Sequence, residues 1–125
     1  MSRTNPNDGA STTERVVDHH LKSFAQRDLE GILSDYAPGA VLFTPDGPLR
    51  GLGEIKPLFQ AMITSFEKPG AKFELAQRTI DGEFAYILWT AETANDVYEL
   101  GTDTFVVKGG KIVAQSFAVK FAPKS

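Results

Sequence analysis

The C-terminal half of the chain is a series of four long strand-like stretches, which narrows the possible folds more than any other feature. All four are rich in Phe, Val, Ile, Thr and Tyr, which favour strands. They cover residues 72–80, 84–93, 98–108 and 112–121. Asp81-Gly82 and Gly109-Gly110 are typical of tight hairpin turns, and Asn95-Asp96 is a weaker turn signal. Because hairpins place each strand beside the next, this half predicts a long antiparallel meander.

The N-terminal half shows the apolar periodicity of helices instead. Ser11 and Glu14 have the spacing of a capping box, and apolar residues then recur at helical intervals to about Arg27. Asp28 is placed to cap a second, short helix over residues 29–36. These patterns predict two consecutive helices before the first strand.

A short strand and a third helix complete the N-terminal half. Pro38-Gly39 ends the second helix, residues 40–44 are a short run of strand type, and residues 45–48 form a turn. The third helix is predicted over residues 54–66, with Pro57 in its first turn, where a missing N–H is tolerated best.

Helices followed by an antiparallel meander are typical of the α+β class, in which the helices pack on one face of the sheet. We expect a cone-shaped, curved antiparallel sheet wrapped by the three helices. The 125 residues, 42% of them hydrophobic, are enough for one domain. We expect residues 1–10, rich in Asn, Gly, Pro and Asp, to be a flexible tail and residues 11–125 to be that single domain.

Two polar residues interrupt the apolar faces of these elements. His20 lies on the stripe of the first helix that includes Val17 and Phe24, and Asp103 alternates with Phe105 on a strand. Burying a polar group without a partner costs a few kcal/mol, so two such residues that face one interior predict a site. We expect both side chains to be mostly buried in one cavity and in contact, directly or through water.

The period of two along the strands and the helix stripes assign further residues to this cavity. Large apolar side chains are expected to form core and wall rather than a cofactor site: Phe24, Phe59, Met62, Trp89, Phe105 and Phe117. Glu99 shares a strand face with Asp103 and is expected at the rim. Gln115 shares a face with Phe117 and could offer an amide. Such a cavity suits an apolar ligand oriented by a few polar groups.

Charge and cysteine content exclude several classes of function. The net charge is −3 and Lys and Arg are scattered singly, so we expect no nucleic-acid partner. Without cysteine, disulfides, thiolate zinc sites and cysteine nucleophiles are excluded, and a cytoplasmic location is expected. We expect no metal, because His19 and His20 point about 100° apart around a helix and His19 faces the surface. No cofactor is expected either, since no phosphate-binding loop is present.

No apolar run approaches the ~20 residues that span a bilayer, so no membrane partner is expected. The segment MSRTNPNDGA lacks the apolar core of a signal peptide. Phe84, Tyr86 and Leu88 lie on the strand face opposite Trp89, so large apolar groups occupy both faces of the sheet. A second copy of the chain would cover that outer face, and we therefore expect a homodimer.

Two segments carry a resemblance to a known family: RDLEGILSDYAPGAVLFTPDGPLRG after the first helix and GTDTFVVKGGKIVAQSF in the final hairpin. With the order of elements, they resemble the nuclear transport factor 2-like superfamily, in its SnoaL-like and ketosteroid-isomerase-like branches, over residues 12–122. The resemblance implies the fold. It does not settle the activity, because this fold carries isomerases, cyclases, hydratases, epoxide hydrolases and binding modules.

The resemblance also implies roles for single residues. Ketosteroid isomerases have an oxyanion-hole tyrosine where this chain has His20, and a protonated aspartic acid that matches Asp103 in GTDTF; that acid is a known example of a neutral carboxyl donor. Their general-base aspartate precedes the proline after the first strand, which is the place of Thr44 in this chain's pocket. Threonine does not accept a proton at neutral pH, which argues against steroid-type isomerisation. SnoaL-like cyclases use an aspartate on the strand of Asp103.

Two hypotheses follow. In the first, the protein is a cofactor-free enzyme of isomerase, cyclase or hydrolase type that uses Asp103 and His20 for acid/base work on a small hydrophobic molecule. In the second, it is a non-catalytic ligand-binding or dimerisation module, and His20 is a core histidine bonded to Asp103 or to a backbone carbonyl. The missing aspartate at Thr44 favours the second.

Overall fold

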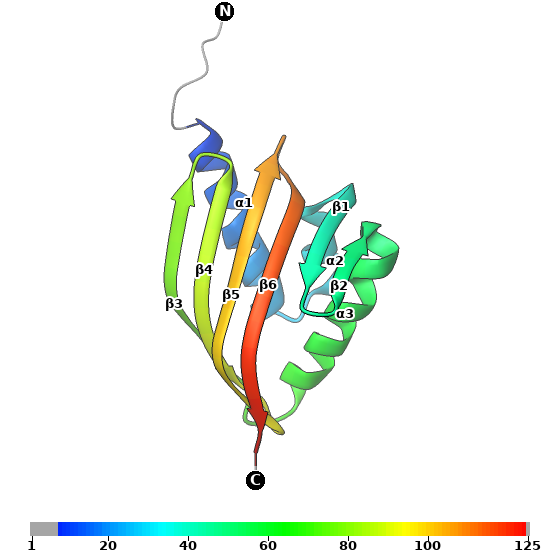
Figure 1. Ribbon diagram of the computed structural model, residues 1–125, viewed down its shortest axis with the longest axis vertical. Helices are drawn as coiled ribbons and strands as arrows, with labels where there is room; N and C mark the ends of the chain where they lie inside the picture. The colour runs from blue at the N-terminus through cyan, green and yellow to red at the C-terminus, as the bar shows by residue number, and fades with distance from the viewer. Residues whose placement is uncertain (1–7, 125) are drawn as a thin grey trace, which may run out of the picture.

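The computed structural model describes residues 8–124, which form a curved six-stranded sheet and three helices that cover one of its faces (Figure 1). The helices are α1 (Asp8–Ala25), α2 (Leu29–Ser34) and α3 (Gly51–Glu67). The strands are β1 (Tyr36–Thr44), β2 (Gly47–Arg50), β3 (Lys72–Asp81), β4 (Phe84–Glu92), β5 (Asp96–Lys108) and β6 (Lys111–Pro123). None of the helices in the described part is long and apolar enough to cross a membrane.

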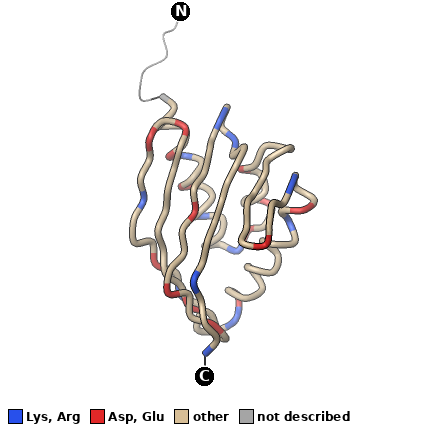
Figure 2. Tube along the Cα trace, in the orientation of Figure 1, with Lys and Arg blue, Asp and Glu red and all other residues tan. Residues whose placement is uncertain are grey.

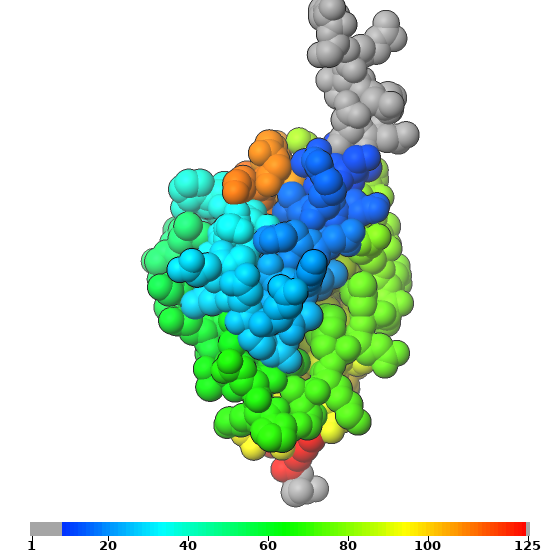
Figure 3. Space-filling model, turned by 180° about the vertical axis from the view of Figure 1, so that it is seen from behind, coloured from blue at the N-terminus to red at the C-terminus, as the bar shows by residue number. Residues whose placement is uncertain are grey.

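The strand order in the sheet is β2-β1-β6-β5-β4-β3. All neighbouring strands are antiparallel except β1 and β6, which are parallel. The long strands β3 to β6 bend and converge toward the C-terminus, and this gives the molecule its taper (Figure 1). Seen from behind, α1 and α3 lie across the concave face, with α2 between them (Figure 3). The predicted α+β cone is confirmed.

The ends of the first helix differ from the prediction. α1 already includes Asp8, so Ser11 and Glu14 lie inside the helix and the predicted capping box is wrong. Of the tail predicted over residues 1–10, residues 1–7 lie outside the described residues, and the rest is helical. The cap of α2 is confirmed, because the carboxylate of Asp28 accepts a hydrogen bond from the backbone N–H of Gly31 at 3.0 Å.

Two other boundaries shift. α2 ends at Ser34 and Tyr36 begins β1, whereas the sequence predicted a helix through residue 36. Part of the predicted 45–48 turn is strand, because β2 pairs with β1. α3 begins at Gly51, so Pro57 lies in its second turn rather than its first.

Two β-bulges change which side chains face the interior. In the pairing of β5 with β6, Tyr98 lies opposite Phe121 and Leu100 opposite Lys120, so Glu99 is an extra residue. A second irregularity lies at Val113 in β6. Since an extra residue reverses the alternation of faces beyond it, predictions from a strict period of two fail at these points.

Candidate functional site

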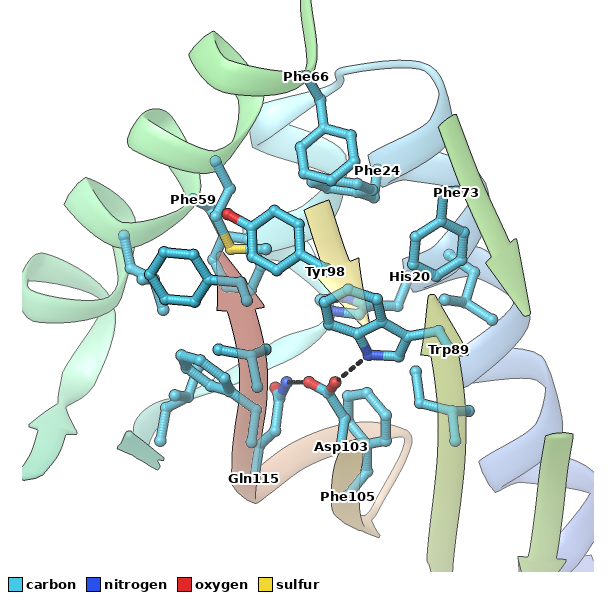
Figure 4. Close-up of a pocket in the computed structure, with 18 residues that line it drawn as sticks. His20, Phe24, Phe59, Phe66, Phe73, Trp89, Tyr98, Asp103, Phe105 and Gln115 are labelled. Atoms are coloured by element: carbon cyan, nitrogen blue, oxygen red, sulfur yellow. Dashed lines mark hydrogen bonds between the residues drawn. The ribbon is translucent and has the colours of Figure 1, made fainter. Parts of the chain in front are cut away.

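A cavity of about 200 Å³ lies between the concave face of the sheet and helices α1 and α3 (Figure 4). Its walls are almost entirely apolar. The lining residues are His20, Leu21, Phe24, Leu42, Leu58, Phe59, Met62, Phe66, Phe73, Ile87, Trp89, Tyr98, Asp103, Phe105, Gln115, Phe117, Val119 and Phe121. The structure thus brings together around one cavity the predicted polar pair and most of the predicted pocket residues: Phe24, Phe59, Met62, Trp89, Phe105, Gln115 and Phe117.

Two predicted pocket residues lie elsewhere. Thr44 is at the β1–β2 turn, where its hydroxyl donates to the carbonyl of Gly47 at 2.9 Å and accepts from the backbone N–H of Asp46. Glu99 is the extra residue of the β5 bulge, which turns it outward to pair with Lys120 at 3.4 Å. Glu99 was predicted beside Asp103 because strict alternation was assumed, and the bulge breaks that alternation. Thr44 was predicted in the cavity, but its hydroxyl is occupied by hydrogen bonds within the β1–β2 turn.

Asp103 is half-buried at the polar end of the cavity (Figure 4). The indole N–H of Trp89 donates to its Oδ1 and the amide Nε2–H of Gln115 donates to its Oδ2, both at 2.8 Å. Burial raises the pKa of the Asp103 carboxyl above its usual value, while these two donors and the nearby His20 oppose that rise. Asp103 is therefore a carboxyl group in an apolar cavity with a pKa moved toward neutrality.

His20 is 5% exposed and its ring lies among those of Tyr36, Phe59 and Phe105, all nearly perpendicular to it. Its Nδ1 is 3.3 Å from Oδ2 of Asp35, and its Nε2 is 3.4 Å from the hydroxyl of Tyr36. A carboxylate can only accept, so Nδ1 carries a proton.

Tyr36 and Gln115 connect the two predicted site residues. The hydroxyl of Tyr36 donates to Oε1 of Gln115, whose amide donates in turn to Asp103. Burial raises the pKa of Tyr36 well above its usual value, so the phenol stays neutral and keeps its proton. His20 and Asp103 both line the cavity as expected, but the contact between them runs through two side chains.

His19 lies on the surface, as predicted, with a side chain that is 51% exposed. Its Nδ1 nevertheless contacts Oδ1 of Asp35 at 2.7 Å. Asp35 is buried and its two carboxylate oxygens thus face two adjacent histidines. Sequence reasoning missed Asp35 because the predicted second helix covered residues 29–36, whereas Asp35 lies between α2 and β1.

Sequence reasoning also missed the aromatic residues of the cavity mouth. Tyr98 faces the cavity because of the bulge at Glu99, and its ring stacks on those of Phe66 and Phe121. Phe73, on the edge strand β3, packs against Trp89 and is 39% exposed. The abundance of aromatic residues was a signal for a cavity wall. For Tyr98, however, only the bulge at Glu99 shows that the side chain faces inward.

Across residues 8–124, no group of three or more His, Asp or Glu side chains is placed to hold a metal ion. The lining residues also include no Lys or Arg. An organic anion in the cavity would therefore find no cation and would lie near the carboxyl of Asp103. The arrangement can bind an uncharged apolar molecule and exchange a proton with it at one end.

Residues 17–115 match the sequence model of the SnoaL-like domain. Among solved structures, a nuclear transport factor 2-like protein from Mesorhizobium loti is 24% identical, with a TM-score of 0.78 over 93% of this chain and 97% of that chain. A candidate ketosteroid isomerase from Kribbella flavida is 14% identical, with a TM-score of 0.74 over 93% and 83% of the two chains.

AclR, a candidate hydroxylase from Streptomyces galilaeus, is 12% identical to this chain, with a TM-score of 0.74 over 89% and 90% of the two chains. At these identities the likeness shows a shared fold. No curated protein sequence gives a significant match.

Proposed function

Because the chain belongs to the SnoaL-like domain family, we propose that it binds a small uncharged hydrophobic molecule and transfers a proton on it with Asp103 and His20. The similar solved structures from Mesorhizobium loti and Kribbella flavida confirm the nuclear transport factor 2-like fold that the sequence predicted. The observation that carries the proposal is Asp103, a carboxyl with a raised pKa that lines an apolar cavity. General bases and acids need a pKa near the working pH, and burial moves the pKa of Asp103 upward, in that direction.

The size and charge of the cavity define the ligand. Its volume of about 200 Å³ is below the ~300–1,000 Å³ of common ligand pockets, so a compound of one or two rings fits better than a tetracyclic one. The lack of Lys and Arg in the wall favours an uncharged compound. We propose a compact hydrophobic carbonyl compound with its oxygen toward His20.

The proposed chemistry is proton abstraction next to the carbonyl. The Asp103 carboxylate takes the α-proton and becomes a carboxylic acid, and the electrons of the C–H bond move to the carbonyl oxygen. His20 lines the same cavity, and the positive charge of a proton held on its ring would stabilise the developing enolate. Asp103 then returns the proton to the ligand, and neither a metal nor a cofactor takes part in these steps.

The Asp103→Asn variant tests the role of Asp103. Asparagine fits the network, since its amide can donate to Oε1 of a flipped Gln115 while its oxygen accepts from Trp89. Gln115 would then donate to Tyr36. The variant should therefore fold and bind the ligand, but it should not exchange α-protons in D₂O with a panel of one- and two-ring ketones and lactones.

Trp89 is the single tryptophan of the chain and contacts both the cavity and Asp103, so its fluorescence reports binding directly. Equal exchange rates in the wild type and Asp103→Asn would reject the catalytic role. Binding without exchange on any panel member would support the second candidate, a ligand-binding module. That candidate is favoured by Thr44, which leaves no carboxylate at the isomerase base position.

We also propose a homodimer through the outer face of the sheet. Three rows of paired side chains cross this face, and their positions in β1, β6, β5 and β4 carry no charge. Charged residues stand only at the two ends of the first row, where Arg50 of β2 pairs with Val41 and Asp81 of β3 pairs with Phe84. The rows are Val41, Ala114, Val106 and Phe84; Phe43, Ser116, Thr104, Tyr86 and Thr79; and Ala118, Thr102, Leu88 and Gln77. Figure 2 shows the charged positions mainly toward the ends of the strands. A face with an uncharged centre, on which Phe43 and Phe84 are more than half exposed, suits a second copy of the chain as its partner.

Such a dimer would bury on the order of 1,500 Å². Light scattering at micromolar concentration tests it, and a monomer would contradict it. We further propose a cytoplasmic location, which the cysteine-free sequence supports.

A further inference from the structure

The two histidines of the chain share one carboxylate. Nδ1 of His19 is 2.7 Å from Oδ1 of Asp35, and Nδ1 of His20 is 3.3 Å from Oδ2 of the same group. The His19 side chain is 51% exposed and the His20 side chain 7% exposed. The cluster therefore begins in solvent and ends at a ring that lines the cavity.

The shared contact is not what helix geometry alone would give. Consecutive residues point about 100° apart around a helix and seldom reach one partner. Asp35 reaches both because it lies between α2 and β1, beside α1, with its carboxylate between the two rings. Within the described part of the chain, its side-chain oxygens have no partners other than these imidazoles. A carboxylate flanked by two imidazoles can accept a proton from one and release a proton to the other.

We propose that Asp35 and His19 carry protons between solvent and His20. In the outward direction, Nδ1–H of protonated His20 gives its proton to Oδ2 of Asp35. The carboxylic acid so formed turns until its proton lies on Oδ1, and it gives that proton to the bare Nδ1 of a His19 ring that starts in its Nε2–H tautomer. The Nε2–H of the resulting His19 imidazolium then gives its proton to water. Each transfer breaks one N–H or O–H bond and forms another, and the inward direction reverses the steps. Asp35 and His19 are positioning residues, since they act through His20.

A filled cavity makes such a path useful. His20 is 5% exposed, and an apolar ligand would keep water away from its cavity side. The link on the other side of the ring leads through Tyr36 to the amide of Gln115, and amides do not exchange protons readily. The path through Asp35 points away from the cavity toward the surface. The role of this proton path in turnover rests on the proposed function, whereas the proton transfer itself can be measured without any substrate.

Nitrogen-15 NMR of the imidazole groups tests the path without any substrate. Only two histidines contribute signals, so single variants assign them. We expect the solvent exchange of the His20 ring N–H to slow by about tenfold or more in His19→Asn, because acid–base groups contribute ~10²–10⁴ in rate. Added imidazole buffer should restore the exchange, which a merely structural role would not predict.

Lys22→Gln is the matched control, since Lys22 is exposed on the same helix, and exchange in it should equal that of the wild type. His19→Gln serves as a second variant if His19→Asn folds poorly. Equal exchange rates in the wild type and a folded His19 variant would overturn the proposal.

Turnover is measured separately, as ketone α-proton exchange in D₂O. Slowed N–H exchange in a protein without turnover would retain the path and reject the proposed function. Unchanged N–H exchange in the His19 variants of a protein that does turn over ketones would reject the path and retain the proposed function.

Discussion

The indole ring of Trp89 lies directly over Gly101, its partner across the β4–β5 pair. A Cβ at position 101 would overlap the ring atoms of the indole. Because glycine leaves this space free, the indole can lie flat across β5 and bring its N–H to Asp103, two residues along the same strand. A residue with no side chain thus sets the environment of the candidate base.

Gly101→Ala should therefore displace the indole and weaken its hydrogen bond to Asp103. We expect the free energy of unfolding to fall by about 1–3 kcal/mol, the usual cost of overpacking. Chemical denaturation followed by Trp89 fluorescence measures both the stability and the change in the surroundings of the ring.

Gly53→Ala is the matched control for this substitution. Gly53 lies in α3 with open space around a new Cβ, and alanine favours a helix by ~0.5–1 kcal/mol. The control should therefore gain stability. A Gly101→Ala protein as stable as the wild type, with unchanged fluorescence, would contradict the close packing.

The raised pKa of Asp103 predicts how stability depends on pH. An aspartate in an unfolded chain titrates near about 3.9, and burial raises the pKa of Asp103 in the folded protein above that value. Between the two pKa values the folded state binds more protons than the unfolded state, so this group lowers the free energy of unfolding as the pH rises.

Asp103→Asn lacks this titration. Its stability should therefore improve relative to the wild type as the pH rises from about 4 through the pKa of the folded protein. Urea denaturation of both proteins at several pH values measures the difference. A difference that stays constant with pH would show that the pKa is not raised.

The Tyr36 hydroxyl should contribute to stability because it satisfies a buried amide. Tyr36→Phe leaves Oε1 of Gln115 without its donor, and an unsatisfied buried group costs about 1–3 kcal/mol. Thr64→Val is the control, since the Thr64 hydroxyl donates to the carbonyl of Gln60 on the exposed side of α3, and its loss should stay within about 0.5 kcal/mol. Equal thermal denaturation curves for the two variants would argue against the connection between His20 and Asp103.

The sequence predicted the elements well where one local rule decides them. Helical periodicity, the cap at Asp28 and the Gly-containing turns each act within a few residues, and the structure has those features. The start of α3 was missed, because its N-cap residue Arg50 makes no capping hydrogen bond through its side chain and a positive φ at Gly51 begins the helix. The backbone N–H of Arg50 donates instead to the Glu54 carboxylate at 2.7 Å, and this contact lacks the Ser or Thr that marks a capping box in a sequence.

The candidate site was predictable only in part, for a related reason. His20 and Asp103 stood out because each is polar on an apolar face. Tyr36 and Asp35 did not, because their contacts join segments that are distant in the sequence. The face of Glu99 depended on a bulge, and one extra residue in a pairing leaves no mark in the alternation of side chains.

The bulge predicts opposite results for two neighbouring residues. Tyr98→Ala should weaken binding of a one- or two-ring ketone, because it removes a ring from the cavity wall. Glu99→Ala should leave binding unchanged and alter stability by less than about 1 kcal/mol, since its pair with Lys120 is exposed. Titration by Trp89 fluorescence compares the two. A stronger effect of Glu99→Ala than of Tyr98→Ala on binding would contradict the bulge and place Glu99, not Tyr98, in the cavity wall.

The outer face of the sheet predicts the effect of a charge at its centre. Thr104 is exposed and lies between Tyr86 and Ser116 in the middle one of the three rows, which has no charged residue. Thr104→Arg would place an unpaired charge in a buried interface, so we expect the dimer to become a monomer. Thr64→Arg puts the same substitution on the exposed side of α3 and should leave the dimer intact. Light scattering of both variants at equal concentration measures this, and a Thr104→Arg dimer would exclude this face as the interface.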